Sequence, residues 1–339
     1  MCKSVEEVKV AVKEHFEKNF KEGLSSRSNL NGLSFSQISQ SDNDLLTEPF
    51  TEEESDFMNF FHEFYHNAFL PKGITTSFLA LLPKKDHPRV LSDYRPISLI
   101  GCVYKVLSKI LDGVVVVNEI IDLARRRKDH CFLMKVDFEK AYDTVNWRYL
   151  EDMMRRMGFP DIWIRWMRTC IFNSSMSVLI NGSPTADFKV EKGLRQGDPL
   201  SLFLFLIAAE GLTGIIKRAV ELGLYRGYKV SDNIQFNVLQ FADDTILVGE
   251  DNWDNLWSIK SILRSFELVS GLKVNFLKRK IYGLHVADNF MKVASSFLSC
   301  NIDSTPFRFL GIPVGANPRR CATWNGIIES MKSKLSSWQ

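Results

Sequence analysis

The chain has 339 residues, a mass of 38.9 kDa and 45% hydrophobic residues, which is enough to bury a sizeable core and to support two subdomains. Its 43 Lys and Arg against 40 Asp and Glu give a formal net charge of +3, too small by itself to establish a nucleic-acid partner. The 6 cysteines are scattered without a close pair, so the sequence indicates neither a zinc knuckle nor a dense disulfide framework. The amino terminus is charged and no run of about 18 apolar residues occurs, so we expect an intracellular chain without a membrane partner.

The first part of the chain alternates between predicted helices and polar loops. Ser4 begins a capping box, and the apolar stripe after it predicts a helix that ends near Gly23. Residues 24–56 are rich in Ser, Asn, Asp and Glu and predict a loop. A second helix begins near Phe57, with its aromatic residues on one side. Residues 77–82 then predict a strand that leads into a cationic loop.

Cations gather in that loop and in a second cluster further along the chain. Lys84, Lys85 and Arg95 are suited to grip a triphosphate, because ammonium and guanidinium groups match phosphate oxygens. A Lys-Lys turn is also commonly solvated surface, so the local pattern leaves both interpretations open. Residues 111–121 predict a helix, although four consecutive valines favour a strand. The basic residues 125–128 that follow are either a solvated face or a phosphate contact.

The next segment places a carboxylate at the end of a strand. Residues 131–138 predict a strand ending on Asp137, and residues 139–158 predict a helix after it. An acidic residue at a strand end is well placed to meet a carboxylate from a neighbouring strand. Alone, however, such a residue is more often a helix cap.

Glycines mark two turns in the middle of the chain. Asn181 and Gly182 predict a hairpin, and residues 188–190 continue it. In residues 193–201 glycines flank Gln196 just before a hydrophobic helix over 202–221. This arrangement either permits close approach of the backbone to a ligand at a helix amino terminus or is an ordinary entry into a helix.

Asp243 and Asp244 stand side by side within the otherwise apolar residues 239–249. The flanking segments are strand-like, so we expect a strand, a turn at the two aspartates and a second strand. A half-buried carboxylate pair is costly unless a cation compensates it, and Mg²⁺ is the usual partner for such hard oxygen ligands. The alternative is a polar hairpin turn without a metal.

The carboxyl-terminal part continues the alternation of helices and short strands. Its periodicity predicts a helix over 253–270, a strand over 272–276, a helix over 287–299, a hairpin over 307–315 and an amphipathic helix that ends at Trp338.

Seven blocks, taken in order, resemble the reverse transcriptase domain of non-LTR (LINE-type) retrotransposons, in the form abundant in plant genomes. Their combined order is far more specific than any single motif. The blocks are LLPKKDHPRVLSDYRPISLIGCVYKVLSKIL, MKVDFEKAYDTVNW, INGSPTADFKVEKGLRQGDPLS, FLFLIAAEGL, LQFADDTILVGE, SGLKVNF and FRFLGIPVG.

This resemblance implies a fold class and a division into domains. We expect an α+β, right-hand polymerase with an antiparallel palm sheet packed on helices, partial fingers and the start of a thumb. The expected domains are an N-terminal helical and linker region over 1–69, partial fingers over 70–130, the palm over 131–305, and a primer-grip hairpin with the start of the thumb over 306–339.

The resemblance also implies an RNA-directed DNA polymerase that adds dNTPs to the 3′-hydroxyl of a DNA primer on an RNA template. Two Mg²⁺ ions, with Mn²⁺ as an alternative, are expected at the aspartates. Asp137 and Asp243 match the catalytic, metal-binding aspartates. Asp244 matches their neighbour and ranks below Asp243 as a catalytic metal ligand, and the backbone carbonyl of Phe138 matches a further ligand. Such a protein would act in the nucleus or the cytoplasm.

Other positions match the family's substrate-binding residues. Tyr142 matches the aromatic residue that crowds the sugar 2′ carbon, and Gln196 matches a residue beside the incoming nucleotide. The fingers cations that lie near the triphosphate in the family are matched by Lys84, Lys85 and Arg95.

Two further matches concern the leaving group and the primer. Lys273 is the residue that resembles a cation helping pyrophosphate to leave. The segment Phe309, Leu310 and Gly311 resembles the primer-grip hairpin, which holds the primer end by packing and by backbone contacts.

The chain also departs from the family pattern. It skips segments between Glu54 and Ser55 and between Ile110 and Leu111, both in or near the expected fingers, and Leu202 stands where Pro is usual. An alternative to the polymerase is therefore a truncated or decayed retroelement remnant that is inactive and at most binds nucleic acid.

Overall fold

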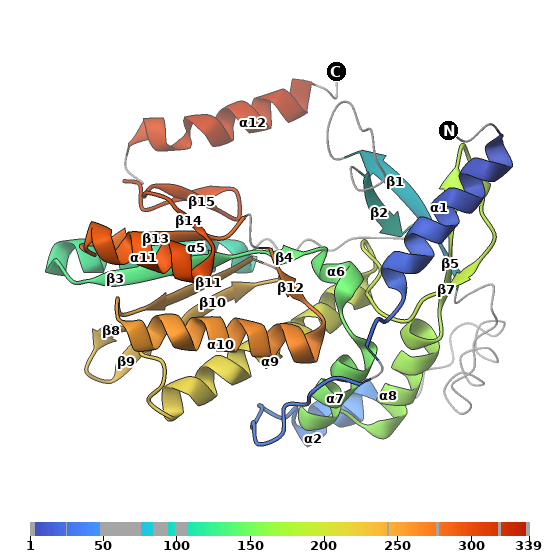
Figure 1. The fold of residues 1–339 in the computed structure, drawn as a ribbon, viewed down its shortest axis with the longest axis horizontal. Helices are drawn as coiled ribbons and strands as arrows, with labels where there is room; N and C mark the ends of the chain where they lie inside the picture. The colour runs from blue at the N-terminus through green and yellow to red at the C-terminus, as the bar shows by residue number, and fades with distance from the viewer. Residues whose placement is uncertain are drawn as a thin grey trace. The chain divides into compact units, whose positions relative to one another are not determined.

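The computed structural model describes residues 4–24, 26–47, 76–83, 94–98, 108–242, 244–275, 278–317 and 320–336. Two compact units divide the chain, and each combines segments that are distant in sequence (Figure 1). The first unit consists of Met1–Tyr104, Lys140–Gly214 and Phe266–Lys273, and the second of Lys105–Glu139, Ile215–Ser265 and Val274–Gln339. The domain boundaries expected at 69, 130 and 305 remain predictions.

Helices and a small sheet make up the first unit. The sheet has the strand order β2-β1-β5-β6, and β7 also pairs with β5. β1 pairs with β5 in parallel and with β2 in antiparallel orientation. The elements are α1 (Val5–Phe20), α2 (Gln40–Leu46), β1 (Thr76–Pro83), β2 (Tyr94–Ser98), α6 (Ala141–Thr144), α7 (Trp147–Arg156), α8 (Asp161–Met167), η2 (Arg168–Phe172), β5 (Ser175–Ile180), β6 (Ser183–Pro184), β7 (Phe188–Lys189) and most of α9 (Pro199–Glu221).

Several predicted elements of this unit are confirmed, and two expectations are wrong. The helix after Ser4, the strand over 77–82 and the hairpin at Asn181 and Gly182 are present. The expected loop 24–56 contains the short helix α2, which Ser39 begins with a capping box. The expected helix over 139–158 is broken, because Val145 is extended and Asn146 caps the new helix α7 by accepting a hydrogen bond from the backbone N–H of Tyr149.

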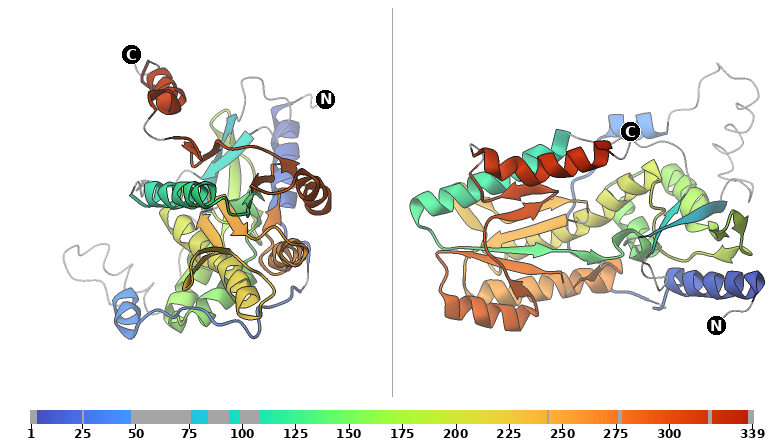
Figure 2. Two further views of the ribbon diagram at one scale, coloured as in Figure 1. Left: turned by 90° about the vertical axis from the view of Figure 1, so that its left-hand side faces the viewer. Right: turned by 90° about the horizontal axis from the view of Figure 1, so that it is seen from above.

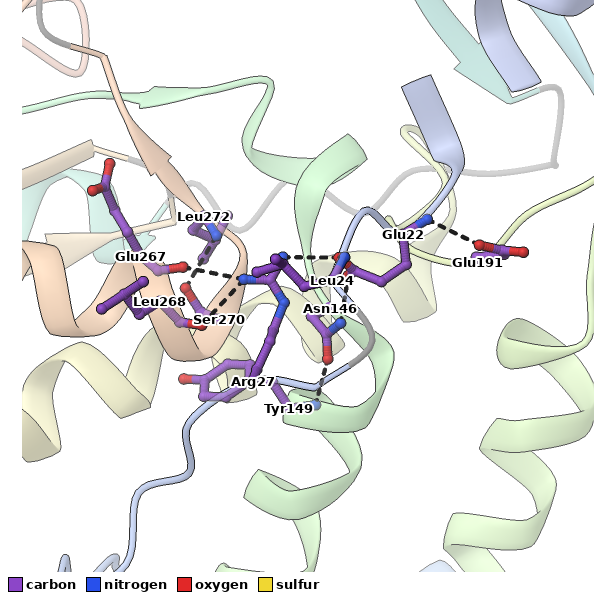
Figure 3. Close-up of polar contacts among 10 residues, drawn as sticks. All are labelled: Glu22, Leu24, Arg27, Asn146, Tyr149, Glu191, Glu267, Leu268, Ser270 and Leu272. Atoms are coloured by element: carbon purple, nitrogen blue, oxygen red, sulfur yellow. Dashed lines mark hydrogen bonds and ion pairs between the residues drawn. The ribbon is translucent and has the colours of Figure 1, made fainter. Parts of the chain in front are cut away.

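A network of half-buried polar groups ties the loop after α1 to the rest of the first unit (Figure 3). Arg27 donates to Glu22 Oε1 at 3.0 Å and to the carbonyl of Leu268 at 3.1 Å. Asn146 donates from its side chain to Glu22 and from its backbone to the carbonyl of Ser270 at 2.9 Å. Burial alone would raise the pKa of Glu22, but the hydrogen bonds from Asn146 and Arg27 outweigh it and hold the pKa below its usual value.

The second unit is built around an antiparallel sheet with the strand order β10-β11-β3-β13-β14, in which only the edge pair β13-β14 is parallel within the part that the structure describes. Two small hairpins and a short ladder of β4 with β12 accompany it. The strands are β3 (Cys131–Val136), β4 (Phe138–Glu139), β8 (Tyr228–Ser231), β9 (Ile234–Phe236), β10 (Val238–Phe241), β11 (Asp244–Gly249), β12 (Lys273–Val274), β13 (Lys280–Leu284), β14 (Asn301–Ile302), β15 (Phe307–Phe309) and β16 (Ile312–Val314). The helices are α5 (Ser108–Arg127), most of α10 (Trp253–Ser270), α11 (Asp288–Leu298), η3 (Cys321–Trp324) and α12 (Asn325–Ser336).

Different elements cover the two faces of this sheet (Figure 2). Cys131 and Leu133 of β3 point into a core that α5 and the β15–β16 hairpin share. On the opposite face Phe132 makes an edge-to-face contact with Phe290 of α11, with ring centres 6.4 Å apart. The alternation along β3 therefore assigns its odd-numbered residues to the face with α5 and the hairpin.

The four consecutive valines lie in a helix, as the sequence predicted. Val114 and Val117 are buried at 3% and 0% exposure, whereas Val115 and Val116 are 55% and 39% exposed. This spacing buries one side of a helix, and it would not bury one face of a strand. α5 also runs without interruption through residues 110–111, where the sequence analysis expected a skipped segment, and that skip remains a prediction. The other expected skip, at Glu54, and the helix expected near Phe57 lie outside the described residues.

The sequence lacked an obvious membrane segment, but α9 is long and apolar enough to cross a membrane by length and composition. Its window Leu200–Glu221 is nevertheless 56% buried inside the structure. A core helix of a folded domain has this same composition, which makes the helix weak evidence for a membrane segment.

Candidate active site

Two carboxylate residues follow the point where β3 and β11 stop pairing in the second unit. Val136 is the partner of Thr245, so Asp137 and Asp244 are the next residues along the two strands and would be opposite each other. Residues opposite one another in an antiparallel pair have Cβ atoms about 4.5–5.5 Å apart, and like charges there repel. The site therefore needs positive charge, which supports the predicted convergence of these two aspartates.

Two lysines supply counter-charge to this pair. Lys135 Nζ lies 3.2 Å from Asp244 Oδ1, and Lys278 Nζ lies 3.5 Å from Asp137 Oδ2. The side chain of Lys278 is 69% exposed, so its ion pair is weak, whereas that of Lys135 is only 21% exposed. The sequence analysis singled out neither lysine, although Lys135 is the one charged residue in the apolar strand CFLMKV.

Asn275 holds Asp137 from two directions. Its backbone N–H donates to the carbonyl of Asp137 at 2.8 Å, and its side-chain amide donates to Asp137 Oδ2 at 3.1 Å. These contacts fix both the chain and the carboxylate after β3. Sequence reasoning missed Asn275, because only the fold brings residue 275 beside the end of β3.

The turn between β10 and β11 has the strand, turn, strand form that was expected. Phe241 pairs with Asp244, which makes Asp244 the first residue of β11 and not part of the turn. Ala242 has a φ of 50°, a left-handed conformation that costs an L-residue about 1–2 kcal/mol. Asp243 lies outside the described residues.

The β15–β16 hairpin, expected as a primer grip, has a two-residue turn. Phe309 pairs with Ile312, and Leu310 and Gly311 between them have φ values of 51° and 81°. Two positive φ angles are typical of a type I′ turn, which suits the twist of a hairpin. Phe309 is fully buried and anchors the hairpin in the core of the second unit.

In the first unit, Tyr142 and Gln196 belong to two segments that are bound to each other. The ring of Tyr142 on α6 stacks on Phe205 of α9, with ring centres 4.7 Å apart. The backbone N–H of Leu194 donates to the carbonyl of Tyr142 at 2.6 Å. Gln196 donates from Nε2 to Asp143 Oδ1 at 3.2 Å, so the buried Asp143 is a further residue that sequence reasoning missed.

Gly193 is the point of closest approach between these segments. Its N–H donates to the carbonyl of Val145 at 2.8 Å, and its own carbonyl accepts from Trp147 Nε1 at 2.7 Å. It has a φ of 90°, and a Cβ there would lie 2.7 Å from the carbonyl oxygen of Asp143. The absence of a Cβ at Gly193 lets its loop approach the backbone of α6. One interpretation of the sequence was instead that the glycines let the loop approach a ligand.

The remaining predicted site residues are Lys84, Lys85, Arg95, Lys273 and Phe138. Lys84 and Lys85 lie outside the described residues, and Arg95 lies on β2 opposite Leu82. Lys273 is exposed on β12, and Phe138 is buried on β4. A cavity of about 790 Å³ in the first unit has none of the predicted site residues in its lining.

The carboxylates fit a divalent metal by their chemistry. Mg²⁺ prefers oxygen ligands and commonly takes one or two carboxylates together with substrate phosphates. Asp137 and Asp244 provide such a pair, and among the described residues no group of three or more His, Cys, Asp or Glu side chains gathers as a metal site. The described donors therefore match a site that substrate oxygens complete.

Comparison with known proteins identifies the family. The model of the family "Reverse transcriptase (RNA-dependent DNA polymerase)" matches residues 82–314, which is more than half of the chain. By its description, the family consists of RNA-dependent DNA polymerases. The chain belongs to this reverse transcriptase family.

The relatives include proteins of mobile elements. An uncharacterized 149 kDa protein of transposon TX1 from Xenopus laevis is 26% identical over 315 residues, covering 84% of this chain and 23% of that protein. A Pol polyprotein from a type-2 retrotransposable element of Drosophila melanogaster is 25% identical over 230 residues, covering 61% and 21%. An uncharacterized mitochondrial protein of Arabidopsis thaliana is 39% identical over 111 residues, covering 31% and 87%. The chain thus spans less than a quarter of the first two relatives.

Proposed function

We propose that the chain is the RNA-directed DNA polymerase module of a plant-type non-LTR retrotransposon, which extends a DNA primer on an RNA template. The observation that carries this proposal is the opposed pair of Asp137 and Asp244, compensated by lysines and fixed by Asn275. The similarity to TX1 and to the Drosophila element supports the retrotransposon, and the Arabidopsis relative supports the plant type. The site of action would be the nucleus or the cytoplasm.

The second unit would serve as the palm. Asp137, Asp243, Asp244 and the carbonyl of Phe138 would hold two Mg²⁺ ions, with Mn²⁺ as a substitute. When bound, the metal activates the primer 3′-hydroxyl and stabilises charge on the leaving pyrophosphate. Asn275 keeps the Asp137 carboxylate in one orientation. This metal-binding side chain therefore does not have to be ordered again in each catalytic cycle.

The primer end would lie against the β15–β16 hairpin, which the buried Phe309 anchors. Beyond it, η3 and α12 would begin the thumb. The nucleic acid would be held through its phosphates, with little reading of sequence.

The first unit would select the nucleotide. Tyr142 would exclude the ribose 2′-hydroxyl, and its stacking on Phe205 limits the movement of its ring. Gln196 would lie beside the incoming dNTP, oriented by its hydrogen bond to Asp143. The triphosphate and pyrophosphate would be contacted by Lys84, Lys85, Arg95 and Lys273.

An inactive remnant is not favoured, because a decayed site has no reason to keep opposed carboxylates, their counter-ions and an orienting amide. The test is primer extension by the purified chain on an RNA template with Mg²⁺. Asp137→Asn should lower the rate by at least about 100-fold, the usual scale for losing an electrostatic contact in an active site. Asp303→Asn is the matched control, because Asp303 also pairs with a lysine of the same sheet, Lys280 at 2.7 Å. Absence of Mg²⁺-dependent extension by the parent chain would refute the proposed activity, and full activity of Asp137→Asn would refute the site.

A further inference from the structure

Lys135 occupies an unusual place for a cation. It lies on the central strand β3, whose other residues are all buried. Its side chain leaves the sheet on the same face as Leu133, toward α5 and the β15–β16 hairpin, and is only 21% exposed. A partly desolvated ammonium group must find polar partners, because it carries three donors.

Its partners connect the carboxylates to the hairpin. Lys135 Nζ lies 3.2 Å from Asp244 Oδ1 and donates to the carbonyl of Arg308 at 3.4 Å. It also lies 5.7 Å from the centre of the Phe309 ring, within the range of a cation–π contact. One ammonium group therefore touches β11, which begins with a proposed metal ligand, and β15, which belongs to the proposed primer grip.

We propose that Lys135 is a positioning residue that couples the Asp244 carboxylate to the β15–β16 hairpin, and that its ammonium group competes with a divalent cation for that carboxylate. This inference rests on the proposed function. Without metal, Lys135 neutralises Asp244 and holds the hairpin through Arg308 and Phe309. With a divalent cation at Asp244, Lys135 loses its carboxylate partner and only the contacts to the hairpin remain.

Two consequences follow from this geometry. First, removal of the Lys135 charge should tighten metal binding, because Asp244 then has no competing cation. A neighbouring cation commonly lowers the affinity of a carboxylate for a proton by about one to three pKa units, which is about 10- to 1,000-fold. Solvent screens this partly exposed pair, so we expect a smaller gain in metal affinity, of roughly 3- to 10-fold. Second, the mobility of the hairpin should depend on metal only while Lys135 is present.

The same sheet offers a matched control. Lys280 on β13 is the direct cross-strand partner of Lys135, and it pairs with Asp303 at 2.7 Å. Lys280 thus has the same charge, the same kind of partner and a neighbouring place in the sheet, but its carboxylate is not a proposed metal ligand. Lys280→Met should lose an ion pair without changing the binding of metal.

The experiment measures Mn²⁺ binding by the electron paramagnetic resonance signal of the free ion, in the complete chain without substrate. Lys135→Met should lower the dissociation constant roughly 3- to 10-fold, Lys135→Arg should leave it near the parent value, and Lys280→Met should not change it. Lys135→Gln, which keeps a polar group but not the charge, should behave like Lys135→Met and replaces it if the latter does not fold. Unchanged or weaker binding in both neutral variants would overturn the competition.

Hydrogen exchange of the backbone amides in residues 307–314 tests the coupling. Mn²⁺ should raise exchange in the parent chain and in Lys280→Met, and should have no effect in Lys135→Met. A metal response that is equal in all three proteins would overturn the coupling to the hairpin.

These outcomes are separable from those of the proposed function. Mn²⁺ binding that shows the Lys135 effects in a chain without primer extension would uphold this inference and refute the polymerase. Binding that survives the triple substitution Asp137→Asn, Asp243→Asn and Asp244→Asn would show that the metal lies away from the proposed site, and would refute both.

Discussion

Replacing Gly193 by Ala should damage the chain far more than the same change at another glycine with a similar backbone angle. Gly193 has a φ of 90° and Gly182 has a φ of 78°. A left-handed conformation costs an L-residue about 1–2 kcal/mol, and the stiffer unfolded chain of the alanine variant returns about 0.4–1 kcal/mol. These two contributions are common to both variants.

The surroundings of the two glycines differ. A Cβ at Gly193 would lie 2.7 Å and 3.0 Å from the carbonyl oxygen and carbon of Asp143, whereas nothing lies within 4 Å of a Cβ at Gly182. The atoms of Asp143 are backbone atoms, so they cannot turn away as a flexible side chain would. Overpacking of this kind costs about 1–3 kcal/mol. We therefore expect Gly193→Ala to lower the free energy of unfolding by about 2–4 kcal/mol and Gly182→Ala by about 1 kcal/mol.

Urea denaturation of the two variants measures this difference directly. Gly193→Ala should also weaken the contacts between α6 and the loop that carries Gln196, and so raise the KM for dNTP in the proposed reaction. Equal losses of stability in the two variants would refute the close approach of Gly193 to α6.

Three further changes test other parts of the molecule. Gly211→Ala should cost about 1–3 kcal/mol, because its Cβ would overlap the Tyr149 hydroxyl, and Tyr149→Phe should cost about 1 kcal/mol by losing the hydrogen bond to the carbonyl of Ala208 at 2.7 Å. The double variant should cost clearly less than the sum, and an additive result in urea denaturation would contradict the overlap. The folded chain holds the pKa of Glu22 below its usual value, so the stability that Glu22 contributes should be complete at neutral pH and be lost as the pH falls below 4.5. Glu22→Gln should flatten this acid dependence of the melting temperature, and an unchanged curve would exclude the effect. Tyr142→Ala should admit ribonucleotides in primer extension, and unchanged discrimination would refute its proposed role as a gate.

The sequence was sufficient to predict the elements that have one strong local signal. The apolar run before Asp137 and the two strand-like segments beside Asp244 are such signals, and their convergence needs only the rule that neighbouring strand ends meet. The helix of α5 was less clear, because the valines favour a strand, and only their burial pattern decides. The break at Val145 could not be predicted from the apolar periodicity. The Asn146 side chain starts a new helix by a hydrogen bond to the backbone, and the spacing of apolar residues carries no information about such bonds.

The partners of the carboxylates could not be predicted for a different reason. Lys135, Asn275 and Lys278 acquire their roles from pairing and from loop positions that are set by the whole sheet. In the sequence, Lys135 is a single cation in an apolar strand. The residues around it in the sequence do not indicate which acidic residue lies beside it in the fold. Residues of this kind are found only when the strand order and pairing are known.

The central position of β3 limits how this domain can change over evolutionary time. An insertion or deletion of one residue in an edge strand leaves the rest of a sheet in place, but β3 has β11 on one side and β13 on the other. One added residue between Leu133 and Asp137 would turn Asp137 to the opposite face, or else force Leu133 out of the core. We therefore expect related chains to tolerate changes of loop length, whereas a length change in β3 would remove the folded core and the carboxylate site in one step.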